Sequence, residues 1–318
     1  MLKWFRTASA SSGLIALCPG GDGIAAARVS RGAGTAPLLE WVDYLPATRS
    51  DTNRATALRQ MLTTHGAHGQ PSTSVLPTGD YHLLLLEAPA VPAEELREAA
   101  RWRVKDLIDF DVEEAVVEVF RTPPMKGGRD NMVYAVVARE QAVRRLIDEI
   151  EGVEQPLACI DIPEFALRNV TAQLAEDVAG VAFLHLEADA GLVVITRQGE
   201  LYLSRRFEGS VARLLASAGA GVSAENEGLL DTVVIEIQRS LDYYESQFAQ
   251  PPVRNLVVAP LAQPFEGLEA YLGSQLGIAA RRLALDALIE CASPPDERVG
   301  ARCLVAVGAA LRELEAVA

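Results

Sequence analysis

The sequence predicts a mixed α/β protein of two lobes, each built around a three-stranded meander that a helix follows. The first observation lies in Val181–Phe207, where β-branched and large apolar residues form three short runs separated by turns. Glycine occurs in both turns, where a positive φ is often required. The runs and turns are Val181–Leu186, Asp189-Ala190-Gly191, Leu192–Thr196, Gln198-Gly199 and Glu200–Phe207.

The second observation is that the N-terminal part repeats this plan. The apolar run Leu14–Leu17 is followed by the turn Gly20-Gly21-Asp22-Gly23, a returning strand at Ile24–Val29 and a third strand at Leu38–Val42. The third observation is size, because 318 residues with 49% hydrophobic content suffice for two domains with substantial cores. Repetition of one unit in such a chain predicts two related lobes.

Between the meanders, the pattern predicts two further elements and then an insert at about Tyr81–Glu151. The run Leu83-Leu84-Leu85-Leu86 lacks alternation, so both faces of its strand are expected to be covered. Pro92 followed by Glu94 and Glu95 is typical of a helix start. The insert is therefore of α+β type. The expected elements are a helix at Ser50–His65, strands at Thr73–Leu76, Tyr81–Glu87, Ala115–Arg121 and Met132–Ala138, and a helix at Glu140–Glu151.

The rest of the chain alternates between strands and helices. Leu229–Phe248 is the clearest helix, because apolar residues recur in it at spacings of three and four. The other expected elements are strands at Leu157–Ile162, Asn255–Val258 and Arg281–Ala284 and helices at Pro163–Leu174, Gly209–Ala218, Phe265–Leu276 and Ala301–Val317.

Composition argues against several classes of function. The 29 basic and 43 acidic residues give a net charge of −14, which disfavours nucleic-acid binding. Four cysteines without a Cys-x-x-Cys pair indicate reduced thiols. We expect no membrane span and no signal peptide, since every apolar run is short. His65 and His68 lack a cysteine or acid at ligand spacing, so we expect a solvated helix end and no metal site.

Four stretches in the same order resemble the PilM/MshI group of type IV pilus assembly proteins, relatives of the cytoplasmic part of the type II secretion protein GspL. The resemblance covers roughly Gly13 to Arg312. The stretches are Pro89-Ala90-Val91-Pro92-Ala93-Glu94-Glu95-Leu96 with Trp102 and Asp109-Phe110-Asp111, then Ile160-Asp161-Ile162-Pro163-Glu164-Phe165-Ala166-Leu167, Glu236-Ile237-Gln238-Arg239-Ser240-Leu241-Asp242-Tyr243-Tyr244, and Val305-Ala306-Val307-Gly308-Ala309-Ala310-Leu311-Arg312.

The resemblance implies an actin-like, ribonuclease H-like ATPase fold. Its first lobe would span residues 1–159, with the insert at about 81–151, and its second lobe residues 160–300. Residues 301–318 would pack back on the first lobe as a helix. The N-terminal stretch Gly13–Ala27 favours the MshI branch, which serves the mannose-sensitive (MSHA) pilus.

The same resemblance implies a scaffold on the cytoplasmic face of the inner membrane. Such proteins hold the cytoplasmic tail of a single-span PilN-like protein and link it to the pilus assembly ATPase. The tail groove lies between the first lobe and its insert, where we expect an extended peptide. The two stretches assigned to this groove, Leu83–Leu86 and Val116–Phe120, could instead be interior strands. The residues assigned to the groove are Leu83, Leu84, Leu85, Leu86, Val116, Val117 and Val119.

ATPases of this fold hold nucleotide phosphates with the two meander turns, and here both depart from the family's pattern. In the second turn, His185, Glu187 and Leu192 replace the expected Asp, Gly and Thr, and in the first turn Ile15-Ala16-Leu17 replaces Asp-x-Gly. Ala259-Pro260-Leu261 replaces the adenosine-side Gly-Gly. A carboxylate at position 187 should repel a nucleotide. We therefore expect a pseudo-ATPase without cofactor. The vestigial nucleotide pocket would comprise Gly20, Gly21, Asp22, Gly23, His185, Glu187, Asp189, Gly191, Glu236 and Arg239.

Three alternatives remain open from the sequence. The chain could be an active ATPase or small-molecule kinase that binds ATP and Mg²⁺. It could also be a GspL fragment cut before its membrane span. Glu236 and Arg239 could face a nucleoside or form a surface ion pair three residues apart. His185 is expected to be a packed, hydrogen-bonded side chain.

Overall fold

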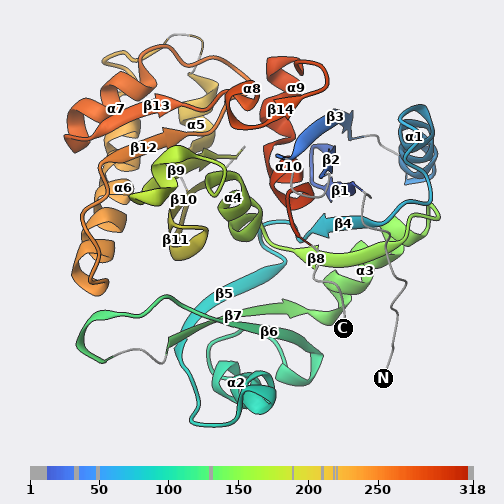
Figure 1. The fold of residues 1–318 in the computed structure, drawn as a ribbon, viewed down its shortest axis with the longest axis horizontal. Helices are drawn as coiled ribbons and strands as arrows, with labels where there is room; N and C mark the ends of the chain where they lie inside the picture. Colours follow the sequence, from blue (N-terminus) through green and yellow to red (C-terminus); the bar gives the residue numbers. More distant parts are fainter. Residues whose placement is uncertain are drawn as a thin grey trace.

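The protein consists of two large sheets and one small sheet (Figure 1). The computed structural model describes residues 13–31, 36–47, 51–128, 132–187, 190–208, 211–217, 219 and 221–313. The strand orders are β14-β3-β2-β1-β4-β8 in the first lobe, β11-β10-β9-β12-β13 in the second lobe and β5-β7-β6 in the insert.

The two lobes follow the same plan. In each, an antiparallel meander continues into parallel strands, since β1 pairs with β4 and β9 pairs with β12 in parallel. The strands are β1 (Leu14–Pro19), β2 (Gly23–Ser30), β3 (Leu38–Pro46), β4 (Ser72–Val75), β5 (Tyr81–Glu87), β6 (Ala115–Arg121), β7 (Met132–Arg139), β8 (Leu157–Asp161), β9 (Val181–Leu186), β10 (Ala190–Arg197), β11 (Glu200–Glu208), β12 (Asn255–Val258), β13 (Ala279–Arg282) and β14 (Glu290–Cys291).

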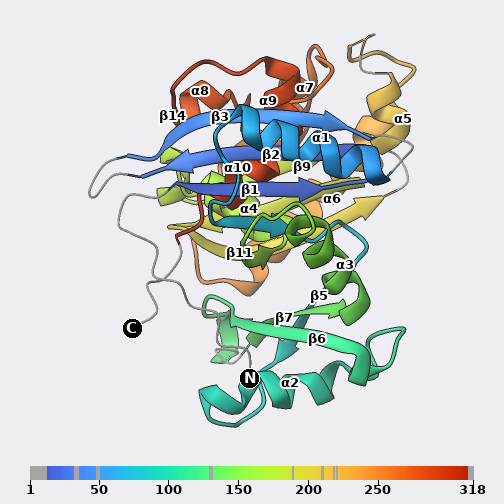
Figure 2. The ribbon, with the colours of Figure 1, turned by 90° about the vertical axis from the view of Figure 1, so that its right-hand side faces the viewer.

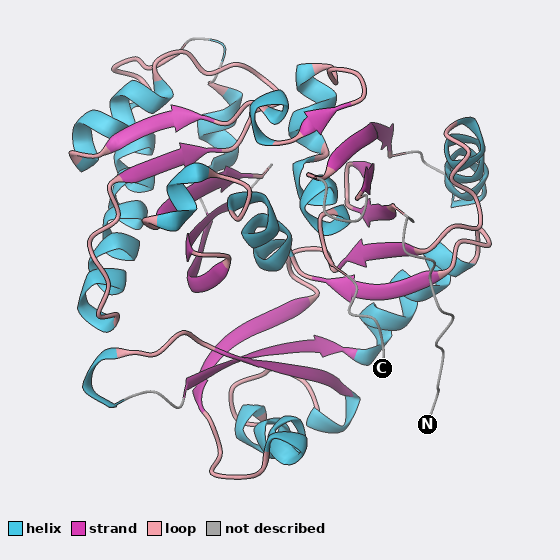
Figure 3. Cartoon of the chain, in the orientation of Figure 1, coloured by secondary structure: helices cyan, strands magenta, loops and turns pink. Residues whose placement is uncertain are grey.

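Helices cover both sides of each of the two large sheets (Figure 3). They are α1 (Asp51–Thr64), α2 (Leu96–Val104), α3 (Glu140–Glu151), α4 (Pro163–Thr171), α5 (Val211–Ala216), α6 (Glu227–Gln247), α7 (Leu268–Leu276), α8 (Leu285–Leu288), α9 (Glu297–Arg302) and α10 (Leu304–Ala310), with 3₁₀ turns at Ala93–Glu95, Val112–Glu114, Lys126–Gly128 and Ala175–Val178.

Helices α4 and α10 lie between the two large sheets and form the core that joins the lobes (Figure 1). The inner face of β1 and β2 carries small side chains such as Ala16, Ala25 and Ala27, so α10 packs closely against it. The helices also meet closely, because a Cβ at Gly308 would lie 2.1 Å from the backbone oxygen of Ala166. Only glycine fits at this crossing.

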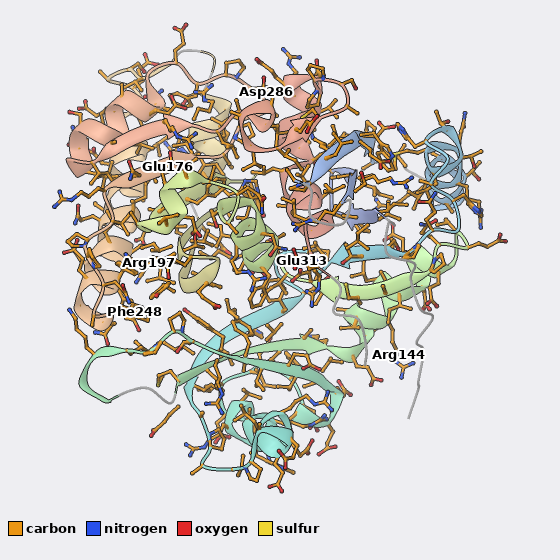
Figure 4. All side chains as sticks on the ribbon, in the orientation of Figure 1. Arg144, Glu176, Arg197, Phe248, Asp286 and Glu313 are labelled. Atoms are coloured by element: carbon orange, nitrogen blue, oxygen red, sulfur yellow. The ribbon has the colours of Figure 1, made fainter. Side chains whose placement is uncertain are left out.

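The outer faces of the sheets have cores of their own. Helices α1 and α3 cover the outer face of the first sheet, where Ile15 and Leu17 alternate with the inward Ala16 (Figure 2). Helix α6 packs through Val233, Ile237 and Tyr244 on the far face of the second sheet. Its last turn adjoins Phe248, which Figure 4 labels at the lower end of this helix.

Most predicted elements are present within two or three residues of the expected bounds. Tyr81–Glu87, Ala115–Arg121, Glu140–Glu151, Val181–Leu186 and Asn255–Val258 have the predicted bounds. Gln198 and Gly199 form the predicted turn with φ of 53° and 76°. The Gly20–Gly23 turn joins β1 and β2 as expected.

Three predictions are wrong. The single helix Ala301–Val317 is two helices, because Cys303 departs from helical geometry with φ −97° and ψ 3°. The chain also returns to the first sheet before Ala301, since Glu290 in β14 pairs with Leu38. Third, the strand is not covered on both faces. Leu83 and Leu85 are half-buried because their face borders a cavity, while Leu84 is half-buried on the face that packs against α2.

Candidate functional site

The first meander turn is held by contacts within the first lobe. Arg302 Nη1 donates to Asp22 Oδ2 over 2.7 Å, and the Tyr44 hydroxyl donates to the backbone oxygen of Asp22 over 2.7 Å. The Arg302 guanidinium lies 4.6 Å from the Tyr44 ring centroid. A Cβ at Gly23 would lie 2.3 Å from the backbone oxygen of Leu45, so packing accounts for this glycine. The carboxylate and glycine of this turn are therefore already used in the folded chain.

The second meander turn contacts the opposite lobe. Thr78, which follows β4, donates its hydroxyl to Glu187 Oε2 over 3.1 Å. His185 Nε2 lies 3.9 Å from Glu187 Oε1, and His185 Nδ1 is buried without a hydrogen-bond partner. The histidine is packed as predicted, but the expected hydrogen bond is not present among the described residues. Its burial lowers the pKa of His185. Asp189 lies outside the described residues.

Gly191 also has a packing role. A Cβ there would lie 2.1 Å from the ring of Phe207, its register partner on β11. A glycine at the position expected to approach a phosphate thus makes room for a neighbouring aromatic ring.

A buried polar network joins the two lobes beside this turn. The Tyr81 hydroxyl donates to Glu164 Oε2 over 2.6 Å, and Arg206 Nη2 donates to the Tyr81 hydroxyl oxygen over 3.0 Å. Arg206 Nη2 also lies 3.4 Å from Glu164 Oε1, and the Glu164 side chain is 3% exposed. Burial and the nearby Glu164 carboxylate raise the pKa of Tyr81. The charge of Glu164 is thus compensated inside the protein.

A cavity of about 580 Å³ lies beside this network, between the insert and the second lobe. Leu83 and Leu85 on β5 line it, facing Leu203 and Arg205 on β11. Both β5 and β11 are edge strands of their sheets. The cavity is therefore bounded by two strand edges and by the Tyr81–Glu164–Arg206 network.

The remaining predicted pocket residues make contacts within the second lobe. Arg239 Nη1 donates to Glu236 Oε1 over 2.7 Å, so the predicted surface ion pair is present. Arg205 Nη1 lies 3.8 Å from Glu236 Oε2. The N–H of Ala259 donates to the backbone oxygen of Leu184 over 2.8 Å. The adenosine-side position is thus a buried strand end.

A second, larger hollow separates the insert from the core of the first lobe. It has a volume of about 1060 Å³, and we call it the β6–β8 groove. Val116, Glu118 and Phe120 of β6 form one wall, and Leu157–Asp161 of β8 with the following Ile162 form the other. Helix α4 contributes Phe165 and Arg168, and the C-terminal segment contributes Arg312 and Glu313. Glu313, labelled in Figure 4, lies where the lobes and the insert meet.

Both walls of the β6–β8 groove are sheet edges. Strand β6 pairs only with β7, and β8 pairs only with β4, among the described strands. The N–H of Thr122 donates directly to its partner Met132 over 3.2 Å. Because bonded and non-bonded pairs alternate in antiparallel sheets, the backbone groups of Val117 and Val119 face away from β7. They are available to an added strand.

The structure divides the predicted partner-binding residues between three places. Leu83 and Leu85 face the 580 Å³ cavity, and Val116 lines the β6–β8 groove. The side chains of Leu84, Leu86, Val117 and Val119 pack in the insert's own core against α2. The predicted set therefore does not line one groove.

Sequence reasoning missed the contributions of β8, α4 and the C-terminal segment to this groove. The sequence did contain a signal for the contribution of α4: Phe165 and Arg168 lie three residues apart on this helix and therefore share a face.

The prediction of a solvated helix end holds for His68 but is wrong for His65, which is half-buried. His65 Nε2 lies 2.9 Å from Asp43 Oδ2, and its ring stacks on Trp41 with centroids 4.2 Å apart. His68 is exposed. In the described part of the chain, no three His, Cys, Asp or Glu side chains are clustered so as to hold a metal ion. No helix in that part has the length and apolar character needed to cross a membrane.

Comparison with known proteins supports the fold. No protein-family model and no curated protein matches the sequence. A chain of a PilM–PilN type IV pilus biogenesis complex superposes with a TM-score of 0.74 at 19% identity, covering 94% of this chain and 98% of that one. The cytoplasmic domain of EpsL, an inner membrane component of the type II secretion system of Vibrio cholerae, has a TM-score of 0.52 at 12% identity, covering 95% and 97%. The chain thus has the actin-like fold of these pilus and secretion proteins.

Proposed function

We propose that the protein is a non-catalytic cytoplasmic scaffold of type IV pilus biogenesis, in an MSHA-like system. It binds the cytoplasmic tail of a single-span PilN-like inner-membrane protein in the β6–β8 groove. The likeness to a chain of a PilM–PilN complex supports the choice of partner class. The bound tail keeps the protein at the inner membrane, and the scaffold links it to the pilus assembly ATPase.

The observation that carries the proposal is that the groove is lined by two strands, β6 and β8, each of which has an open edge in the described part of the chain. An extended tail bonds to the backbone groups of Val117 and Val119, as in strand addition. Its apolar side chains pack against Val116, Phe120 and Phe165. A groove of about 1060 Å³ accommodates several residues of such a peptide.

We further propose that the protein works without nucleotide or Mg²⁺. Asp22 in the first meander turn bonds to Arg302, and Glu187 in the second bonds to Thr78. A phosphate between the turns would have to displace these contacts and approach the Glu187 carboxylate. An active ATPase or kinase is the alternative, and nucleotide binding distinguishes it.

The test is binding of the cytoplasmic tail peptide of a single-span PilN-like protein, measured by calorimetry. Val119→Pro removes one N–H from the open edge of β6, whereas Val119→Ala truncates the same side chain and keeps that N–H. We expect Val119→Pro to weaken binding about tenfold or more and Val119→Ala to have a much smaller effect. Equal affinity for both variants would contradict tail binding along β6.

A further inference from the structure

The charged side chains that line the β6–β8 groove are almost all paired within the protein. Arg312 Nη1 donates to Asp161 Oδ2 over 3.0 Å, and Arg31 pairs with Glu313. Two charges lack an ion-pair partner in the described chain, Glu151 at the exposed end of α3 and Arg168 on α4. The remaining acid of the groove, Glu118, is 3.0 Å from Arg97.

Arg168 differs from Glu151 because it is half-buried. Its guanidinium lies 4.9 Å from the Phe165 ring centroid, and Nη2 donates to Asn169 Oδ1 over 2.9 Å. The carboxylates of Asp161 and Glu200 act on it only from beyond ion-pair distance. An arginine has five donors, so most of those of Arg168 have no acceptor among the described residues.

Both carboxylate oxygens of Asp161 already accept a hydrogen bond from groups other than Arg168. Its Oδ2 accepts from Arg312, and its Oδ1 accepts from the N–H of Ile162 over 3.0 Å. Two guanidinium groups therefore share one buried carboxylate. Burial lowers the pKa of Arg168, which reflects the cost of holding this cation away from water.

We propose that Arg168 binds a carboxylate side chain of the tail and selects tails that carry an acid at that position. This inference rests on the proposed function and names the chemistry of the partner segment. The planar guanidinium, whose Cζ lies over the Phe165 ring, carries paired donors of the kind that bind a carboxylate through two hydrogen bonds. The tail therefore combines apolar residues with an Asp or Glu that reaches α4.

The experiment measures the affinity of the same tail peptide, by calorimetry, for wild type and for Arg168→Gln and Arg168→Lys. We expect about 10- to 100-fold weaker binding to Arg168→Gln and an intermediate loss for Arg168→Lys, which keeps the charge but not the fork. Arg239→Gln, which removes an exposed arginine of α6, is the control and should bind as wild type does. Thermal unfolding verifies that each variant is folded.

A second series replaces each acidic tail residue by its amide. One replacement should weaken binding to wild type by the same factor and have no further effect on Arg168→Gln. Arg168→Glu should regain affinity when that tail acid becomes lysine. If the tail binds in a Val119-dependent manner but neither Arg168→Gln nor any amide changes its affinity, the role of Arg168 is wrong while the proposed function stands. If the tail does not bind wild type at all, both are wrong.

Discussion

The Thr78 hydroxyl donates a 3.1 Å hydrogen bond to the Glu187 carboxylate, and this contact joins the two lobes at the second meander turn. The sequence predicts that Glu187 replaces a glycine that approaches a phosphate. In the structure this side chain makes an interlobe contact. Beside it, the Tyr81–Glu164–Arg206 network makes a second interlobe contact.

The first prediction concerns nucleotide binding. Millimolar Mg-ATP should leave the melting temperature of the wild-type protein unchanged, because Asp22 and Glu187 are committed to Arg302 and Thr78. A ligand present at 100 times its Kd would add about 2.7 kcal/mol to the free energy of unfolding. A reproducible rise of several degrees would favour the ATPase or kinase alternative.

The second prediction concerns the buried network. Tyr81→Phe removes the hydroxyl that donates to Glu164 and should lower the free energy of unfolding by about 1–3 kcal/mol. Arg206→Met leaves the 3% exposed Glu164 side chain without its cation and should cost about 3–5 kcal/mol. Adding Glu164→Gln to Arg206→Met should recover part of that loss. Urea unfolding measures all three, and additive losses would argue against a coupled network.

The third prediction separates packing from ligand binding at Gly191. Gly191→Ala places a methyl group against the Phe207 ring and should destabilise the protein by about 1–3 kcal/mol. Phe207→Leu should relieve much of this cost in the double variant. The control is Gly228→Ala on α6, where a Cβ meets nothing within 4 Å and helix propensity favours alanine. Thermal unfolding of Gly191→Ala equal to that of wild type would refute the packing role.

The fourth prediction concerns pH and His185. Burial lowers the pKa of His185 in the folded state, so below about pH 6.5 the unfolded state binds more protons. The contribution of His185 is therefore present above the unfolded pKa and is lost as pH falls through the folded pKa. His185→Leu should reduce the fall in melting temperature between pH 7.5 and pH 5.5. The control His68→Leu alters an exposed histidine and should keep the wild-type profile; identical profiles for all three proteins would contradict the prediction.

The two meanders could be predicted because their strands alternate with turns that require glycine, as at Gly199. The break at Cys303 could not, because Leu304, Val307 and Leu311 recur at helical spacing and no proline interrupts the stretch Ala301–Val317. The insert strand at Leu83 was expected to be covered on both faces, since four successive leucines give no alternation. Its second face instead borders a cavity between parts that are far apart in the sequence.

The β6–β8 groove also depends on contacts between distant parts of the chain, which the sequence does not reveal. Val116 could be assigned from its position on an insert strand, but its neighbours on β8 and α4 reach the groove only through tertiary packing. The sequence around Arg168 does not show that Asp161 pairs with Arg312 instead of with Arg168. The charge balance of a groove depends on ion pairs between segments that are far apart in the sequence. The spacing of apolar residues along the chain does not predict such pairs.

Amide hydrogen exchange with and without the tail peptide tests tail binding at the β6–β8 groove most directly. We predict slower exchange at the amides of Val117 and Val119 on β6 and along β8, because the added strand bonds to these edges. The amides of Gly20–Gly23 and of Glu187 should exchange at unchanged rates. Protection confined to these two turns, with none on β6 or β8, would contradict tail binding at the β6–β8 groove.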